Sequence, residues 1–312
     1  MNLLSRRRFC ALTAATAAGA AIDAKRAWAS VTGLPIGIQL YTVGKPYADD
    51  PAGTLKQLRA MGYREVETSI MPKLSAKDQR KMMDDAGLTC PSVHMDMNGT
   101  NLDAGLADVH TLGAHYALSS VLRDILPELR KAEEEARKTG KAGMPALPPL
   151  GMDGFKKTAA HMNEVGRKVK AAGLQYAYHN HNFEFEKMPD GSVGYDILVK
   201  ETDPDLVKFE VDCGWMTVAG SDPLAYFGKY PGRFRMLHIK DFQKGTEPTT
   251  DLTGPGRPKG TDLGTGFIDY KQIFAAAKGA GVEHIFAEQE PPFAVSQMAS
   301  AKADFAYMQK FS

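Results

Sequence analysis

Histidine and acidic residues stand at the ends of four apolar runs in the second half of this chain. They occur in Tyr178-His-Asn-His-Asn-Phe-Glu184, Phe209-Glu-Val-Asp212, Leu237-His-Ile-Lys-Asp241 and Phe286-Ala-Glu-Gln-Glu290. Imidazole and carboxylate groups together are typical ligands of a divalent metal ion. The four segments are spread over more than a hundred residues. They meet only if the fold gathers strand ends, which is what a parallel barrel does.

The alternation of side chains along a strand sorts these residues by face. If Asp212 points into a barrel, Glu210 and Lys208 do too, while Phe209 and Val211 face the surrounding helices. The same alternation places His179, His181, His238 and Glu288 inside, between apolar neighbours that face outward. A buried set of charges is costly unless it is paired or bound to a cation. The pattern therefore predicts a metal site.

Short β-like runs alternate with amphipathic helical segments through most of the chain. The pattern predicts strands near residues 36–43, 64–68, 89–97, 115–121, 174–182, 207–213, 234–240 and 284–288. It predicts helices near residues 51–61, 76–86, 102–112, 155–172, 223–230, 270–280 and 295–310. Eight strand–helix alternations indicate a single α/β domain, a (β/α)8 TIM barrel over residues 30–312. A charged helix at 123–138 and a loop at 141–149 are expected beside the active-site mouth.

The first 29 residues have the pattern of an export signal. Ser5-Arg-Arg-Arg-Phe9 precedes a short apolar run, and Ala27-Trp-Ala29 is a typical cleavage site. The paired arginines resemble a twin-arginine signal, which predicts the twin-arginine translocase as a partner and a periplasmic or otherwise exported location. The run is too short and too rich in alanine to cross about 30 Å of hydrocarbon. We therefore expect no stable membrane insertion.

The charge of the processed chain argues against a nucleic-acid partner. Residues 1–29 hold five basic residues and one acidic residue, so their removal from 38 and 37 leaves 33 basic against 36 acidic residues. A net charge near −3 lacks the basic surface that nucleic acids require. The remaining 283 residues suit one barrel of about 250 residues. The sequence leaves open whether the chain forms a homo-oligomer.

The chain resembles the xylose-isomerase-like barrel family, which includes sugar isomerases, sugar epimerases, inosose dehydratases and endonuclease IV. The matching pieces are Gly37-Ile-Gln-Leu-Tyr-Thr-Val43, Gly62-Tyr-Arg-Glu-Val-Glu67, Ser92-Val-His94, His179-Asn-His181, Phe209-Glu-Val-Asp212, Leu237-His-Ile-Lys-Asp241, Asp262-Leu-Gly-Thr-Gly266 and Ala287-Glu288. They span nearly the whole chain after the signal, and their order is specific to a family whose reactions are diverse.

The resemblance implies one divalent metal ion held by strands five to eight. Carried onto this sequence, the ligands are Asp212, His238, Glu288 and one group from strand five, where the family commonly offers a glutamate. Here we expect His181 as that ligand, with His179 or Glu184 as the acid–base group beside Glu288. Two imidazoles and two carboxylates favour manganese, with zinc, cobalt or iron next and magnesium as a weaker fit. The ion would polarise a carbonyl and stabilise the enediolate formed when the neighbouring carbon loses a proton.

Other polar or aromatic residues are expected to line a pocket for a carbohydrate. They are Gln39, Tyr41, Glu67, His94, Trp215 and Lys240. Trp215 and Tyr41 are equally consistent with ordinary packing at the rim, and Lys240 with an ion pair to Glu210 or Asp241.

The main interpretation is a metal-dependent sugar isomerase or epimerase acting on a keto or aldo sugar or a related polyol. The alternative is a metal-dependent lyase or dehydratase that expels a β-leaving group from a keto-sugar or keto-glycoside. A binding barrel without catalysis is disfavoured by the ionisable cluster. Endonuclease chemistry is disfavoured by the acidic charge.

Overall fold

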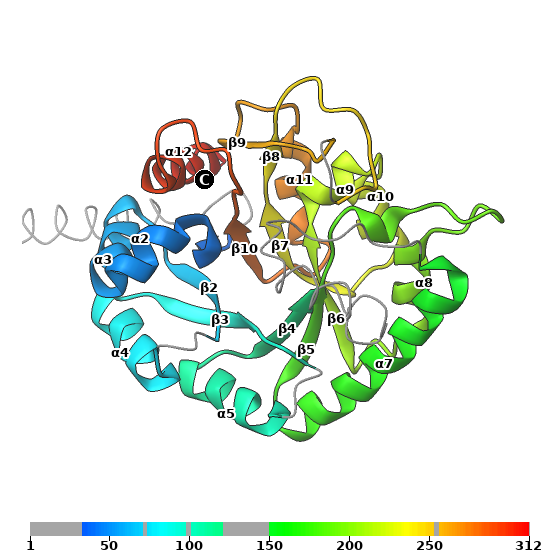
Figure 1. Cartoon of the computed structure of the whole chain (residues 1–312), viewed down its shortest axis with the longest axis horizontal. Coiled ribbons are helices and arrows are strands. Elements are labelled where there is room, and N and C mark those ends of the chain that lie inside the picture. The colour runs from blue at the N-terminus through cyan, green and yellow to red at the C-terminus, as the bar shows by residue number, and fades with distance from the viewer. Residues whose placement is uncertain (1–32, 71–73, 98–100, 121–149, 253–255, 312) are drawn as a thin grey trace, which may run out of the picture.

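The computed structural model describes residues 33–70, 74–97, 101–120, 150–252 and 256–311 (Figure 1). Eight parallel strands close into a barrel. They are β1 (Ile36–Gln39), β2 (Glu65–Ser69), β3 (Thr89–His94), β4 (Tyr116–Ser120), β5 (Gln175–His179), β6 (Val207–Asp212), β7 (Phe234–Ile239) and β10 (His284–Ala287). Neighbours around the barrel are neighbours in sequence, and β10 closes it against β1, with Ile38 opposite Ala287. The predicted TIM barrel is confirmed.

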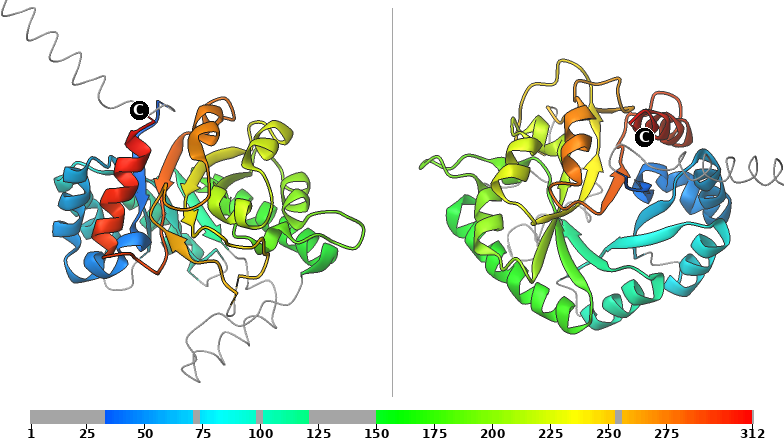
Figure 2. Two further views of the ribbon diagram at one scale, coloured as in Figure 1. Left: turned by 90° about the horizontal axis from the view of Figure 1, so that it is seen from above. Right: turned by 180° about the vertical axis from the view of Figure 1, so that it is seen from behind.

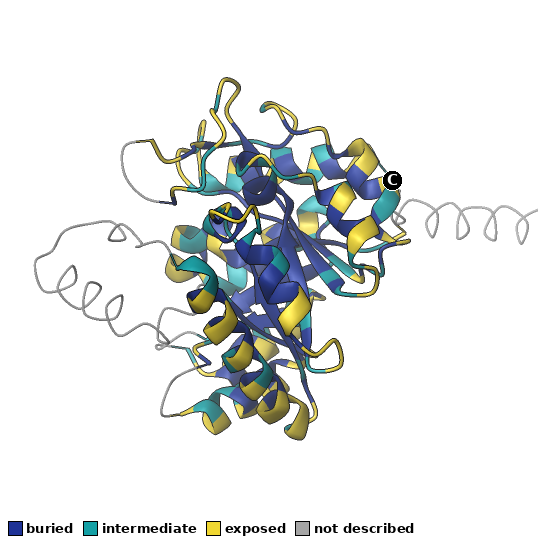
Figure 3. Cartoon of the chain, turned by 90° about the vertical axis from the view of Figure 1, so that its right-hand side faces the viewer, coloured by how far each residue is buried: buried dark blue, intermediate teal, exposed yellow. Residues whose placement is uncertain are grey.

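Helices surround the strands, with exposed residues on their outer faces and the strands buried inside (Figure 3). They are α2 (Gly44–Asp49), α3 (Pro51–Met61), α4 (Ala76–Ala86), α5 (Leu102–Leu112), α7 (Gly151–Ala171), α8 (Gly194–Glu201), α9 (Cys213–Val218), α10 (Pro223–Lys229), α11 (Tyr270–Ala277) and α12 (Gln297–Gln309). Local capping defines several ends. Ser75 accepts from the Asp78 N–H at the start of α4, and Gly87 ends that helix with a left-handed φ of 71°.

Three predicted strands end three or four residues earlier than the sequence pattern suggests, at Gln39, His94 and His179. After β1 the side chain of Gln39 accepts from the Tyr41 N–H, and residues Leu40–Val43 turn into the 3-10 helix η1. After β5 the side chain of Asn180 bonds to the backbone of Asp212, with its Nδ2 3.3 Å from the carbonyl and its Oδ1 3.2 Å from the N–H. The chain leaves the sheet there. His181 therefore stands on a loop and not on the strand that carries His179.

The last helix packs against the first helices of the chain, where the barrel closes. α12 lies beside α2 and α3 (Figure 2). The Tyr63 hydroxyl, just after α3, donates to the Ala301 carbonyl at 2.7 Å, and the Tyr63 ring meets Phe305 edge-on at 5.1 Å. A small antiparallel pair, β8 (Asp241–Phe242) with β9 (Gly260–Thr261), holds the long connection after β7.

Some sequence-based predictions fall on residues outside the described ranges. These are the export signal at 1–29 and the extra helix and loop at 123–149. In the parts that are described, no helix combines the length and the apolar character needed to span a membrane.

Candidate active site

Along β5, β7 and β10 the barrel interior changes from apolar to ionisable side chains. An apolar layer consists of Tyr116, Leu118, Ala177, Met236 and Phe286, which contact one another inside the barrel. Two residues further along three of these strands stand His179, His238 and Glu288. Because side chains alternate, these three point into the same interior. We call the ionisable residues above the apolar layer the charged layer; they are Glu67, His94, His179, Glu210, Asp212, His238, Lys240 and Glu288.

Glu67 is the acceptor at the β2 side of the charged layer. Its Oε1 lies 2.7 Å from His238 Nε2 and 2.8 Å from His94 Nε2, and accepts from Gln39 Nε2 at 3.0 Å. Ser92 Oγ donates to its Oε2 at 2.5 Å. Burial acts to raise the pKa of Glu67, but the positive charge and hydrogen bonds of His94 and His238 hold this pKa well below its usual range. Glu67 is thus an ionised anchor for two imidazoles.

Glu210 is the second deep carboxyl group. Its Oε2 lies 2.9 Å from His179 Nδ1 and 3.2 Å from His238 Nε2. Burial and the negative charge of Glu67 raise the pKa of Glu210 to about 8. Its Oε1 is buried and has no hydrogen-bond partner among the residues that the structure describes. Because His179 is oriented by Glu210 through Nδ1, its Nε2 is available for a ligand or a proton.

Lys240 joins the carboxylates nearest the mouth. Its Nζ lies 2.8 Å from Glu288 Oε2, 2.8 Å from Glu290 Oε1 and 3.4 Å from Asp212 Oδ2. Burial alone would lower the pKa of Lys240, but these carboxylates raise it, so the ammonium is charged. Burial raises the pKa of Asp212 to about 6 against the attraction of Lys240. Lys240 therefore pairs with acids at the mouth, and not with the Glu210 or Asp241 considered from the sequence.

Four side chains meet closely enough to hold one metal ion. Ligand atoms of His179, Asp212, His238 and Glu288 all lie within 4.8 Å of one another. Ligand atoms of a four-coordinate ion at about 2.1 Å lie about 3.4 Å apart, so binding would draw these four side chains closer together. Asp212 Oδ2 is buried and accepts no hydrogen bond from a described residue. The donor set and this oxygen fit a divalent cation.

A second group of the same kind lies deeper. It consists of His94, His179, Glu210 and His238, and it shares His179 and His238 with the first. Each shared imidazole offers two ring nitrogens. The deeper group also contains the buried Oε1 of Glu210.

His181 and Glu184 lie outside both groups. The His181 ring is 5.1 Å from the His179 ring and 6.1 Å from the Trp215 ring, on the loop after β5. Glu184 lies in the 3-10 helix η3 (Phe183–Phe185) and accepts from the Tyr178 hydroxyl at 2.8 Å and the His181 N–H at 2.9 Å. Burial raises the pKa of Glu184 to about 8. Glu184 thus fixes the loop that carries His181; the chemical roles expected for both stay predictions.

The other residues predicted to line the pocket differ in their exposure and in their contacts. Gln39, Glu67 and His94 belong to the network described above. Tyr41 is 61% exposed, as a residue at the rim would be. Trp215 is only 1% exposed, packed 4.8 Å from the Phe242 ring with Lys240 Nζ 5.0 Å from its own ring. Trp215 therefore supports Lys240, and its ring is covered by these neighbours.

Sequence reasoning left three residues out of the site. Side-chain alternation places Glu210 inside the barrel, two residues before Asp212 on β6, but the sequence pattern gives it no role. Glu290 follows Glu288 at the same spacing, but beyond the strand, where alternation no longer predicts direction. Arg257 contacts Glu290 from the glycine-rich segment before β9. No local pattern predicts that contact.

Comparisons with known proteins agree on the barrel. The model of a family described as Xylose isomerase-like TIM barrel matches residues 55–310. An inosose dehydratase from Lacticaseibacillus casei is 31% identical over 151 residues, which cover 45% of this chain and 49% of that protein. An inosose dehydratase from Clostridium beijerinckii is 29% identical over 149 residues. The chain spans about half the length of these curated relatives.

Solved structures are similar in fold. A sugar phosphate isomerase/epimerase from Parabacteroides distasonis has a TM-score of 0.67 and 24% identity, covering 88% of this chain and 93% of its own. A xylose isomerase-like TIM barrel protein from Mycobacterium smegmatis, solved in complex with magnesium, has a TM-score of 0.60 and 18% identity, covering 90% and 97%. At these identities the likeness is one of fold.

Proposed function

Because the chain belongs to the xylose isomerase-like TIM barrel family, we propose that it is an enzyme that moves a proton beside a carbonyl group. The substrate is a keto or aldo sugar or a related polyol, and the product is its isomer or epimer. The observation that carries this proposal is the buried group of His179, Asp212, His238 and Glu288 within 4.8 Å. Such a concentration of perturbed, interlocked ionisable groups is typical of catalytic sites.

A divalent metal ion fits this group. His179, Asp212, His238 and Glu288 would hold it, and the mixture of imidazole and carboxylate favours manganese, zinc, cobalt or iron over magnesium. When bound, such an ion polarises a substrate carbonyl and lowers the cost of the negative charge that develops there. Glu67 and Glu210 orient the imidazoles from below, with Glu67 holding His238 Nε2 at 2.7 Å.

His179, at the end of β5, and His181, on the loop after it, have different roles in this proposal. We assign His179 to the metal group, because it lies inside the group and is oriented by Glu210. His181 then becomes the candidate for proton transfer. Its backbone N–H donates to Glu184, and its ring lies 5.1 Å from the ring of His179. This exchanges the roles expected from the sequence. Metal affinity of His179→Ala and His181→Ala decides the matter: loss only in His181→Ala restores the first assignment.

A second candidate function is a lyase or dehydratase. It is favoured by the matched relatives, which are inosose dehydratases. The first step is the same removal of a proton beside a carbonyl, and the reaction differs only in the loss of a β-leaving group afterwards. The charged layer supports that first step equally in both cases.

Proton NMR of candidate keto-sugars in deuterated buffer with the metal-loaded protein tests both functions. Deuterium entering the carbon beside the carbonyl, with all substituents retained, indicates an isomerase or epimerase. Loss of water or of an aglycone indicates a lyase. His238→Ala is the control for the background rate. If no keto-sugar in a broad panel shows exchange or elimination faster with the wild type than with His238→Ala, the enzymatic proposal is wrong.

We also propose that the protein is exported. Arg6, Arg7 and the Ala27-Trp-Ala29 site support this proposal, with Ser30 as the first residue after cleavage. Arg6→Lys combined with Arg7→Lys should leave the precursor in the cytoplasm, as measured by fractionation and N-terminal sequencing. Normal processing of that double variant would exclude the twin-arginine route.

A further inference from the structure

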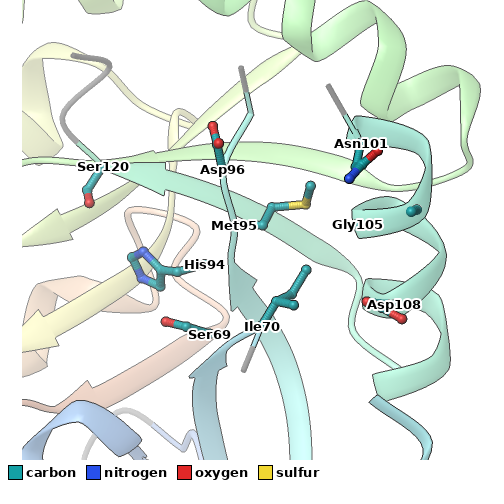
Figure 4. Close-up of a pocket in the computed structure, with 10 residues that line it drawn as sticks. Ser69, Ile70, His94, Met95, Asp96, Asn101, Gly105, Asp108 and Ser120 are labelled. Carbon is teal, nitrogen blue, oxygen red and sulfur yellow. The ribbon is translucent and has the colours of Figure 1, made fainter. Parts of the chain in front are cut away.

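A pocket of about 710 Å³ opens next to His94, a member of the charged layer (Figure 4). Its walls come from the ends of β2, β3 and β4 and from one face of α5. We call it the side pocket. A volume of this size is typical of sites for drug-sized ligands and exceeds what a single sugar ring needs.

The side pocket meets the charged layer at His94. This side chain lines the pocket and is 17% exposed, while its Nε2 lies 2.8 Å from Glu67 Oε1. Its ring is 5.4 Å from the ring of His179. By contrast, the side chains of His179 and His238 are 5% and 1% exposed. His94 is thus the member of the charged layer that a molecule in the side pocket would contact.

The walls of the side pocket determine what can bind there. Its charged side chains, besides His94, are Asp96 and Asp108, and no Lys or Arg belongs to the described lining. Ile70, Met95 and Ala104 add apolar surface. An acidic wall repels phosphate, whereas hydroxyl groups and an apolar face are accommodated.

The cations near the charged layer do not offer a phosphate site either. Lys240 is held by Glu288 and Glu290, and Arg257 also contacts Glu290. Within the described part of the chain, both cations at the mouth are thus engaged by carboxylates. A doubly charged phosphate would have to displace these acids, which costs their pairing with buried Lys240.

We propose that the side pocket receives an uncharged substituent of the substrate, so that the substrate is an unphosphorylated glycoside rather than a free sugar phosphate. The substituent has apolar surface together with hydroxyl groups. This inference rests on the proposed function for the identity of the reacting part, but the binding of the substituent can be measured without any reaction.

The test compares two unreactive probes, phenyl β-D-glucopyranoside and methyl β-D-glucopyranoside. Their dissociation constants are measured by ligand-observed NMR with the metal-loaded protein. The phenyl probe should bind at least about tenfold more tightly than the methyl probe, because burying one aromatic ring typically strengthens binding by that much. D-glucose 6-phosphate should fail to displace it.

Blocking variants locate the binding. Ala104→Phe places a ring in the side pocket from α5, and should remove the advantage of the phenyl probe while leaving the methyl probe unchanged. Ala107→Phe is the matched control, because Ala107 is exposed on the same helix and does not line the pocket. Gly105 is unsuitable, since a Cβ there would lie 2.5 Å from Met95 Cε.

The outcomes separate this inference from the proposed function. Equal affinity for both probes, displacement by the sugar phosphate, or equal behaviour of Ala104→Phe and Ala107→Phe would overturn the side pocket proposal. Absence of turnover with keto forms of the same glycosides, despite selective binding of the phenyl probe, would instead count against the proposed chemistry. Circular dichroism of both variants confirms that each is folded.

Discussion

The apolar layer and the charged layer lie inside the same barrel, and on β5, β7 and β10 a residue of the one stands two residues before a residue of the other. On β7, Met236 belongs to the first and His238 to the second; on β10, Phe286 precedes Glu288 in the same way. The apolar layer excludes water from below, and ion pairs are stronger where water is excluded. On β5, β7 and β10 the position along the strand therefore separates residues that pack the core from residues that can take part in chemistry.

The largest expected effect is on turnover, from the charged layer. His179→Ala should lower kcat by about 10²–10⁴-fold or more, whether His179 holds the metal or moves a proton. The measurement is the rate of deuterium exchange into the substrate. His115→Ala is the control, because His115 is an exposed histidine outside the barrel interior. Equal rates for the two variants would remove His179 from the site.

The next effect is on stability, from the apolar layer. Phe286→Ala should lower the free energy of unfolding by about 3–5 kcal/mol, because it leaves a cavity in a closed interior. Metal affinity of the folded fraction should stay close to that of the wild type. Phe267→Ala, at a position that is 41% exposed, should cost much less in the same urea titration. If Phe286→Ala instead lost metal binding and kept its stability, Phe286 would act in the binding site and not in the packed core.

The charged layer should also make stability depend on pH. The pKa of Glu210 is about 8 in the folded protein, above the ordinary value of 4.5. Between these values the folded state keeps a proton that the unfolded state has lost, so stability falls as pH rises from 4.5 towards 8. This group contributes up to about 1.4 kcal/mol per pH unit in that window. In protein freed of metal by a chelator, Glu210→Gln should make this fall less steep, while Glu184, whose pKa is also raised to about 8, keeps part of it.

The control for this profile is a substitution in the apolar layer. Met236→Leu keeps every ionisable group, so its stability should fall with pH in parallel with the wild type. A parallel fall in Glu210→Gln as well would show that another group causes it.

The smallest effect expected is that of Met236→Leu itself. A swap of similar volume in a packed core costs less than about 1.5 kcal/mol. Turnover should be unchanged, because Met236 lies one layer below the reacting groups. A large loss of kcat in this variant, measured by the same deuterium exchange, would mean that the apolar layer positions His238 as well as supporting it.

The sequence predicts the barrel well because its signals are local and repeated. Side-chain alternation places Asp212, His238 and Glu288 inside, and the helices at 51–61, 76–86 and 102–112 have the predicted limits. The end of β5 was not predictable, because it depends on Asn180 bonding to the backbone of Asp212, 32 residues away. The partners of Lys240 likewise depend on Glu290, whose direction is set by a loop.

The closing strand of the barrel also delivers Glu288, and this ties assembly of the site to the end of synthesis. β10 pairs with β1, and α12 then packs beside α3 through Tyr63 and Phe305. A chain that lacks this last segment has neither the closing strand nor Glu288, one of the four side chains that we propose hold the metal ion. A truncated product therefore leaves both the barrel open and the buried group of His179, Asp212, His238 and Glu288 incomplete.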